Sequence, residues 1–275
     1  MIKIGITGAS GVLGKRLIYF LIKSKNFKIK CYKGNILDVK SISNWIKKNQ
    51  FEIIIHLAAI VPTQKVNKNY KLAKAVNVDG TKNLIIAIKK NQKLKPFLFF
   101  SSTSHVYSFS KKILSEKDKI NGITKYGKTK ILAEKILLKN SKLYNFCIGR
   151  ISSLTSENQK KSFLINNIIY QGKNNKKIIF KNANIKRNFI YVDDVSKIII
   201  KIIKRKITGI LNISNSEITY LPRFFKYLKR KYKFKIEYNF KHFEYLIISN
   251  KLLLRKIGNY KFISMKKIVD KIYSN

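Results

Sequence analysis

The sequence is poor in cysteine, and this scarcity excludes two ways of stabilising a fold. Its 275 residues include two cysteines, Cys31 and Cys147, which are too few for a disulfide framework or a cysteine-rich metal cluster. Both stand in apolar runs, where we expect buried, unreactive thiols. We therefore predict no metal site, and a protein of a reducing cytoplasm.

Long apolar runs are also lacking. No window reaches the roughly 18 uninterrupted apolar residues of a membrane span. The apolar run before the first glycines is too short for a signal peptide. We expect no membrane partner.

Acidic residues and arginine are both scarce in this basic chain. The 13 acidic residues face 59 basic ones, giving a net charge of +46, yet arginine supplies only seven of the 59. Arginine is the preferred residue for bidentate phosphate and base contacts, and the lysines are spread along the whole chain. Because lysine, isoleucine and asparagine share A- and T-rich codons, base composition explains the excess. We predict no specific nucleic-acid partner, although the charge would help attract an anionic substrate.

What the chain does contain is an alternation of strands and helices. Hydrophobic residues make up 45% of it, enough for one large core or for a domain with a smaller lobe. Strands are predicted at 2–7, 51–59, 96–102 and 144–152, and helices at 14–24, 72–91 and 126–140. Such alternation is typical of an α/β fold with a doubly wound parallel sheet. The segment 27–39 is short, so a second and a third strand there would be compressed or partly merged.

The pattern weakens after about residue 150. A strand followed by a helix is predicted over 187–205, a short strand at 209–214, and helices near 220–232 and 264–274. Pro222 would lie in the first turn of one of these helices. No linker rich in proline, glycine or serine separates two independent domains, so a smaller C-terminal lobe fits better.

The stretch "TGASGVLG" at 7–14 follows a strand and opens a helix. Gly8, Gly11 and Gly14 would let the backbone turn tightly and approach a pyrophosphate, to which the helix N-terminus offers free N–H groups. An ordinary glycine-rich turn is the alternative. The strand before it and the helix after it favour a dinucleotide site.

Two further strand ends carry small or polar side chains. Ala58 and Ala59 in "HLAA" would let a flat ligand pack on the backbone at the carboxyl end of a strand. His56 has no metal-ligating neighbour, so we expect a packed histidine. The cluster "SSTS" at 101–104 offers hydroxyl groups to a substrate oxygen, although a simple polar strand end would look the same.

Tyr126 and Lys130 stand four residues apart on a predicted helix, one turn from each other. A nearby ammonium lowers the pKa of a tyrosine from its reference of about 10. Such a tyrosine can exchange a proton at neutral pH. An exposed helix face in a lysine-rich chain would give the same spacing by chance.

Taken together, these motifs resemble the extended short-chain dehydrogenase/reductase family, in its NAD-dependent epimerase/dehydratase branch. The motifs that carry the resemblance occur in family order: "TGASGVLG" at 7–14, "HLAA" at 56–59, "NVDGTKNL" at 77–84, "SSTSHVY" at 101–107, "YGKTK" at 126–130 and "RNFIYVDDV" at 187–195. The resemblance implies an NAD(P)-binding Rossmann domain at 1–150, to which 187–205 return, and a smaller substrate-binding lobe at 151–275. A homodimer is one possible assembly.

The resemblance also implies residue roles. Tyr126 would be the acid/base, Lys130 would hold the nicotinamide ribose and lower the tyrosine pKa, and Thr103 would bond the same substrate oxygen. The implied substrate contacts are Thr103, Ser104, His105 and Arg187. The implied cofactor contacts are Gly8, Ser10, Gly11, Val12, Leu13, Gly14, Asp38, Leu57, Ala58, Ala59, Asn77, Tyr126 and Lys130.

The chain departs from the family pattern in places that bear on its reaction. Ser104 and His105 stand where related 4,6-dehydratases carry Asp-Glu, which argues against dehydration. The residues after Arg150 are "ISSLTS" in place of the usual Asn and Gly-Pro. No acidic residue ends the second strand, and Lys33 lies near that place, which favours NADP slightly over NAD.

The resemblance therefore implies an oxidoreductase that acts on a nucleotide-activated sugar, with hydride transfer at a sugar carbon, C4 above all. The short chain is similar to the dTDP-4-dehydrorhamnose reductase group, but C4 epimerases share the same Thr/Tyr/Lys set, so both reactions stay open. The alternative is a non-catalytic, dinucleotide-binding regulatory protein on the same fold, because fold alone does not establish activity.

Overall fold

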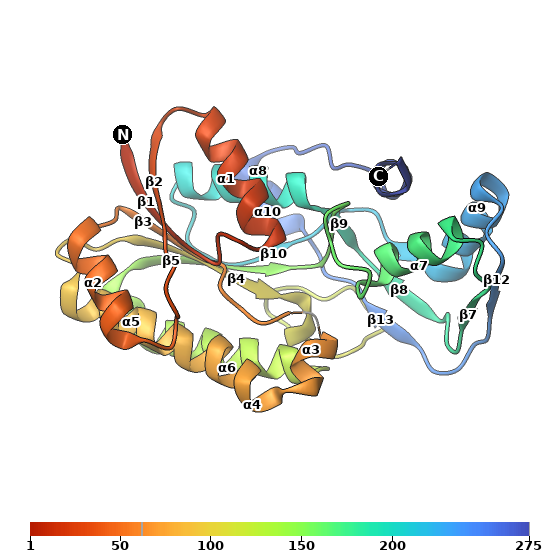
Figure 1. The fold of residues 1–275 in the computed structure, drawn as a ribbon, viewed down its shortest axis with the longest axis horizontal. Coiled ribbons are helices and arrows are strands. Elements are labelled where there is room, and N and C mark those ends of the chain that lie inside the picture. Colours follow the sequence, from red (N-terminus) through yellow and green to blue (C-terminus); the bar gives the residue numbers. More distant parts are fainter. Residues whose placement is uncertain (62, 275) are drawn as a thin grey trace.

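A six-stranded parallel sheet forms the centre of the computed structural model, which describes residues 1–61 and 63–274 (Figure 1). Every neighbouring pair in this sheet is parallel. Its strands, in spatial order, are β10 (Gly209–Ile213), β5 (Asn145–Ile151), β4 (Phe97–Thr103), β3 (Ile53–His56), β1 (Ile2–Thr7) and β2 (Phe27–Cys31).

Helices cover both faces of the sheet (Figure 1). One face packs against α1 (Val12–Lys23), α8 (Val192–Lys204) and α10 (Lys251–Ile257). The other packs against α2 (Val39–Asn49), α5 (Gly80–Asn91) and α6 (Lys125–Lys139). The predicted doubly wound α/β fold is confirmed.

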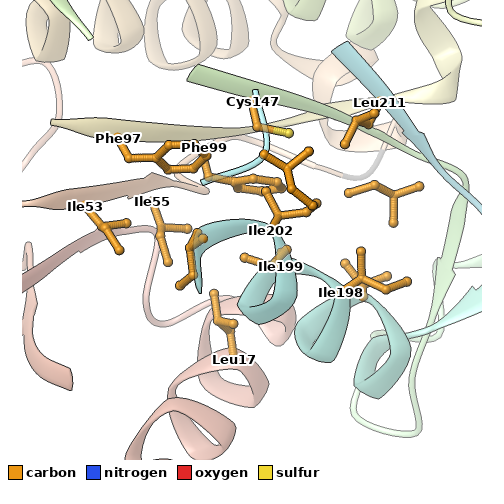
Figure 2. Close-up of a cluster of buried hydrophobic side chains, with 14 of the residues drawn as sticks. Leu17, Ile53, Ile55, Phe97, Phe99, Cys147, Ile198, Ile199, Ile202 and Leu211 are labelled. Atoms are coloured by element: carbon orange, nitrogen blue, oxygen red, sulfur yellow. The ribbon is translucent and has the colours of Figure 1, made fainter. Parts of the chain in front are cut away.

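The apolar runs of the sequence become strands because both of their faces are covered. Ile53 and Ile55 of β3 and Phe97 and Phe99 of β4 point to the α1/α8 side (Figure 2). Ile54, Leu98 and Phe100 point to the α5/α6 side. This two-sided burial fixes the register of the sheet, and with it the place where each strand ends.

The region between α1 and β3 contains one strand, β2, followed by a helix that the sequence patterns did not predict. Asp38 caps α2 by accepting a hydrogen bond from the Ser41 N–H at 2.9 Å. Only Ile42 and Ile46 of α2 are buried, so its apolar stripe is too sparse to stand out in the sequence. The expected compression of two strands is thus observed as a single strand.

The helix predicted over 72–91 is interrupted. Its parts are α4 (Tyr70–Lys74), a π-helical turn (Ala75–Asp79) and α5. Single π turns inside helices often mark functional sites. Here the turn carries Asn77, which is buried.

A second apolar core forms mainly from residues after 150, around α7 (Leu164–Lys173), α9 (Leu221–Tyr232) and α11 (Met265–Ser274). Pro222 lies in the first turn of α9, as predicted. The remaining elements are α3 (Thr63–Lys68), β6 (Ser153–Thr155), β7 (Ile178–Phe180), β8 (Ile185–Arg187), β9 (Phe189–Tyr191), β11 (Thr219–Tyr220), β12 (Ile236–Tyr238) and β13 (Glu244–Leu246). The chain returns to the central sheet at α8 and β10.

The packing of α8 on the sheet gives a stability prediction. Ile199 is 0% exposed in the core of Figure 2, whereas Ile22 on α1 is 63% exposed. Ile199→Ala should lower the free energy of unfolding by about 2–5 kcal/mol, because it removes buried methyl groups and leaves a cavity. Ile22→Ala, the matched control, should change it by less than about 0.5 kcal/mol. Urea unfolding followed by circular dichroism measures both, and equal effects would contradict the packing.

Candidate active site

A cavity of about 800 Å³ opens at the carboxyl ends of β1, β3, β4 and β5, where an open α/β sheet binds its ligands. It extends to β6, the start of α7 and the β8–β9 segment. The predicted site residues that line it are Gly8, Ser10, Gly11, Val12, Leu13, Gly14, Leu57, Ala59, Thr103, His105, Tyr126 and Arg187. Twelve residues from five separate motifs are thus brought together.

The glycine loop packs closely against the loop that follows β3. Gly8 has φ +75°, and a Cβ there would collide with the backbone of Leu57 and Ala58. A Cβ on Gly14 would collide with Gly8 O. This close approach explains why Ala58 packs beneath the loop and does not itself line the cavity. The N-cap residue of α1, Gly11, has no side chain to bond the first N–H groups of the helix.

These features fit a dinucleotide. A backbone that approaches a ligand closely, at the N-terminus of a 12-residue helix, suits a pyrophosphate group. Ala59 on the facing strand end leaves room for a flat ring.

His56 is a packed histidine, as expected. Its Nδ1 lies 2.6 Å from Thr7 Oγ1 and its Nε2 lies 3.0 Å from Thr81 Oγ1. Burial, with a smaller effect of Lys130, lowers the pKa of His56 to about 3. The ring is therefore neutral at physiological pH and ties the end of β1 to α5.

Asn77 ties two loops of the site together and does not line the cavity. Its Oδ1 accepts from the Ile60 N–H at 2.7 Å, and its Nδ2 donates to Thr129 Oγ1 at 3.0 Å. Thr129 in turn donates to the Tyr126 carbonyl at 2.7 Å. The π turn thus fixes the first turn of α6, which carries Tyr126.

Tyr126 and Lys130 lie on one side of α6, but the expected effect of the lysine on the tyrosine is not observed. Burial raises the pKa of Tyr126 above its ordinary 10, and this direction is opposite to the one predicted. Lys130 is 2% exposed, and its Nζ lies 4.0 Å from the centre of the Phe100 ring. Burial lowers the pKa of Lys130 to about 7, against the opposing charge of Glu134. Burial is the only cause of the shift of the Tyr126 pKa, and for Lys130 it outweighs the attraction of Glu134.

Arg187 and His105 form a polar wall beside Thr103. Burial lowers the pKa of Arg187, and Glu244, 3.7 Å away, only partly offsets it. Within the described residues, Arg187 Nε has no hydrogen-bond partner. Burial and the charge of Arg187 lower the pKa of His105 to about 4. A buried, under-paired guanidinium in a cavity wall is suited to an anionic group.

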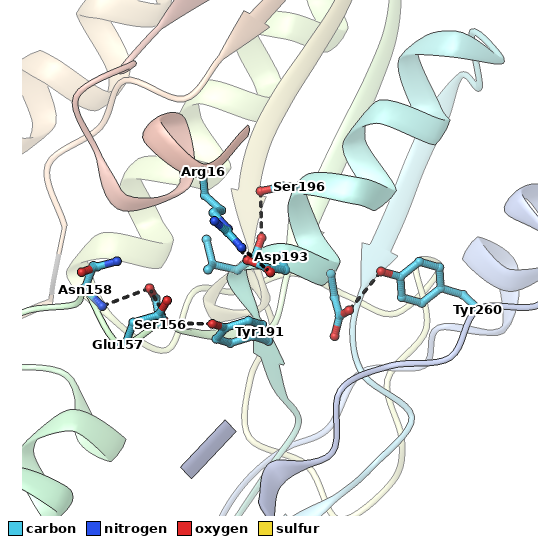
Figure 3. Close-up of polar contacts among 10 residues, drawn as sticks. Arg16, Ser156, Glu157, Asn158, Tyr191, Asp193, Ser196 and Tyr260 are labelled. Atoms are coloured by element: carbon cyan, nitrogen blue, oxygen red, sulfur yellow. Dashed lines mark hydrogen bonds and ion pairs between the residues drawn. The ribbon is translucent and has the colours of Figure 1, made fainter. Parts of the chain in front are cut away.

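The two aspartates at the end of the "RNFIYVDDV" motif are structural (Figure 3). Asp193 forms a two-pronged ion pair with Arg16 of α1, with 2.6 Å between Arg16 Nη2 and Asp193 Oδ2. Asp194 accepts from the Tyr260 hydroxyl at 3.0 Å. One motif thus carries an anion-binding candidate at its first position and anchors α8 at its end.

Three other predicted residues do not line the cavity. Asp38 is the N-cap of α2, Ser104 is buried at the start of a short 3₁₀ turn, and Lys130 is buried against the Phe100 ring. Lys33, on which the slight preference for NADP depends, is exposed just after β2. Their ligand contacts stay predictions.

The sequence patterns missed one whole wall of the cavity. The segment from Ile151 to Ile165 supplies Ser152, Gln159, Lys160 and Phe163, and it follows no recognisable motif. They also missed Glu134, which continues the spacing of Tyr126 and Lys130 by one more helical turn and is buried. That spacing was the available signal.

In the part of the chain that the structure describes, no helix is both long enough and apolar enough to cross a bilayer.

Comparisons with known proteins agree with this geometry. Residues 4–214 match the model of the NAD dependent epimerase/dehydratase family. A GDP-6-deoxy-D-talose 4-dehydrogenase from Aggregatibacter actinomycetemcomitans is 27% identical over 290 residues, covering 99% of this chain and 97% of that protein.

Two solved structures show the same fold. UDP-glucose 4-epimerase from Thermotoga maritima, solved with UDP-glucose, superposes with a TM-score of 0.87 at 19% identity and covers 99% of this chain and 98% of its own. RMD from Pseudomonas aeruginosa, complexed with NADPH, gives 0.88 at 18% identity and covers 100% and 98%. The family match spans most of the chain, and the glycine loop, the strand ends and α6 converge as the motifs predicted. The chain belongs to the NAD dependent epimerase/dehydratase family.

Proposed function

We propose that the protein is an NAD(P)-dependent oxidoreductase acting on a nucleotide-activated sugar, with hydride transfer at C4 and Tyr126 as the acid/base. The observation that carries the proposal is that Thr103 and Tyr126 share one cavity with the glycine loop. A hydroxyl pair beside a dinucleotide cradle is what carbonyl reduction or alcohol oxidation requires.

Each side chain has a role that follows from its contacts. Thr103 Oγ1 accepts from the His105 N–H at 3.2 Å, which leaves its own proton to donate to the sugar oxygen. Because burial raises its pKa, the Tyr126 hydroxyl is protonated at neutral pH and can donate to the oxygen of a carbonyl under reduction. Lys130 and the glycine loop would hold the dinucleotide, which supplies or accepts the hydride. This protonation state favours the reductive direction, because Tyr126 already carries the proton that it would donate.

The cavity is electrostatically suited to a nucleotide diphosphate. Lys65, Lys160 and Arg187 line it, and none of the described lining residues is acidic. A relative named for the 4-dehydrogenation of a GDP-linked deoxysugar supports a C4 reaction on such a substrate. No carboxylate follows Thr103, which disfavours dehydration because that reaction needs an additional acid and base.

The direct test is turnover of NADH and NADPH with a panel of 4-keto nucleotide sugars. Oxidation of either cofactor supports a reductase. Interconversion of C4 epimers with tightly held NAD⁺ supports an epimerase. Cofactor binding without either reaction supports the non-catalytic regulatory protein. The ratio of the two cofactor affinities tests the preference for NADP.

Removal of one hydroxyl tests the acid/base role. Tyr126→Phe should keep cofactor affinity within a few-fold and lower turnover by at least ~100-fold, the lower end for loss of general acid–base catalysis. Steady-state kinetics and NADH fluorescence titration measure the two quantities. Near-normal turnover by the variant would refute the role of Tyr126.

The ionisation of Lys130 predicts a pH dependence of cofactor binding. Below its pKa of about 7 the side chain is charged, so NADH affinity should fall as pH rises through 7, by up to about tenfold per pH unit. His56 and His105, with pKa values of about 3 and 4, do not titrate in this range. Lys130→Met should bind weakly and show no such dependence. A flat wild-type profile from pH 6 to 9 would contradict the assignment.

Arg187 is expected to bind the substrate diphosphate. Arg187→Gln should raise the KM for the nucleotide sugar about tenfold or more, with a smaller change in kcat, because it removes hydrogen bonds to a charged group. Arg223→Gln, on the exposed face of α9, is the matched control and should leave both constants unchanged. Equal effects of the two variants would show that Arg187 acts only through overall charge.

A further inference from the structure

A buried carboxylate lies directly behind the proposed active site. Glu134 is 1% exposed and accepts three hydrogen bonds: one from the Ser102 hydroxyl, one from Arg150 Nε at 3.2 Å, and one from Arg150 Nη2 at 2.8 Å. Its Oε1 receives the first two and its Oε2 the third. The carboxylate is therefore rigidly oriented by a two-pronged guanidinium contact.

Glu134 and its two partners come from three elements that build the active site. Glu134 lies on α6, one turn after Lys130 and two turns after Tyr126. Ser102 directly precedes Thr103 on β4 and lines the cavity. Arg150 lies opposite Ser102 in the register of β5. One carboxylate therefore joins the helix that carries the tyrosine to the strand that carries the threonine.

The guanidinium is in turn held from behind. Arg150 Nη1 donates to the Tyr107 hydroxyl at 2.8 Å, and Tyr107 donates to Asn212 Oδ1 of β10 at 2.8 Å. Arg150 Nη1 also lies 3.4 Å from the Glu116 carbonyl. The network reaches across two strands and leaves the guanidinium no freedom to move away from Glu134.

Stability alone does not require such a network. Desolvation offsets much of the attraction in a buried ion pair, so two apolar residues of similar volume usually stabilise a core equally well. An ion pair with fixed hydrogen-bond geometry does something that apolar contacts do not: it admits one relative position of helix and strand. The position of Tyr126 relative to Thr103 depends on that geometry.

Glu134 also acts on the charge of Lys130. The groups that act on that ammonium are Glu134 from α6, the neutral His56 from β3 and the Phe100 ring from β4. Among these, the Glu134 carboxylate opposes the effect of burial and raises the pKa of Lys130.

We propose that Glu134, held by Arg150 and Ser102, is a positioning residue: it fixes α6 against the end of β4 so that Tyr126 and Thr103 reach one substrate oxygen. Glu134 lies one helical turn after Lys130, so its carboxylate also acts on the charge of that side chain. The proposal rests on the proposed oxidoreductase function. Its consequences for cofactor binding are measurable without any turnover.

The first experiment is Glu134→Gln, which keeps the shape and removes the charge. We expect kcat to fall about 100-fold, the cost of a misplacement of about 1 Å, with KM changed less than threefold. We also expect the decline of NADH affinity with rising pH to begin at a lower pH than in the wild type, since loss of the carboxylate lowers the pKa of Lys130. A purely structural role would not move that profile.

The second experiment separates positioning from folding. Glu134→Leu combined with Arg150→Met replaces the ion pair with apolar side chains, so the double variant should unfold at a urea concentration close to that of the wild type. We expect its kcat to remain about 100-fold low. Asp270→Asn is the control, because it removes one carboxylate from an ion pair with Lys231 on the surface of α11. It should leave kcat and the pH profile unchanged.

Each outcome decides the proposal. A stable double variant with wild-type kcat would overturn it, as would a Glu134→Gln enzyme with an unshifted NADH profile. If the wild type turns over none of the sugars, the proposed function fails, and the NADH profile of Glu134→Gln alone decides the electrostatic part.

Discussion

The parallel alignment of the central strands is the constraint on which the site depends. Because β1, β3, β4 and β5 run in one direction, their carboxyl ends meet at one edge, and the residues that follow each strand converge there. The register is fixed by apolar side chains on both faces of each strand, so a slip of one residue would bury polar groups and expose Ile and Phe. The hydroxyls at 101–103 and the glycines at 8–14 line one cavity for this reason, although some ninety residues separate them.

Burial then sets the chemical character of that edge. It keeps His56 and His105 neutral, holds Tyr126 protonated and weakens the charge of Lys130. In such a site a charged neighbour does not simply impose its preference, because desolvation acts on both partners. The sequence prediction therefore placed Tyr126 and Lys130 correctly on one side of α6. It was wrong about the direction in which the pKa of Tyr126 is shifted. A third charge, on Glu134, is needed to describe Lys130.

The sequence predicted the elements whose signals are local. Long apolar runs identified β3, β4 and β5, and the glycine spacing identified the start of α1. It did not predict α2, whose buried stripe contains two isoleucines, or the π turn at Asn77, which depends on tertiary hydrogen bonds. The cavity wall from 151 to 165 was missed because its residues are assembled by packing between β6 and α7 and share no spacing. Features that depend on tertiary contacts could not be predicted from local sequence patterns.

The basic and acidic residues of the chain differ in how far the structure constrains them. Lysine is abundant throughout, but twelve of the thirteen acidic side chains accept a hydrogen bond or form an ion pair in the described structure. Several lie at joints between elements: Asp193 between α8 and α1, Asp194 between α8 and the segment before α11, and Glu134 between α6 and the sheet. A drift of the gene toward lysine codons can replace a surface carboxylate at little cost, since exposed pairs contribute little. It cannot replace a buried carboxylate without leaving a guanidinium or several N–H groups unsatisfied. The acidic residues that persist in so basic a chain are therefore the better guide to where its structure and its chemistry are constrained.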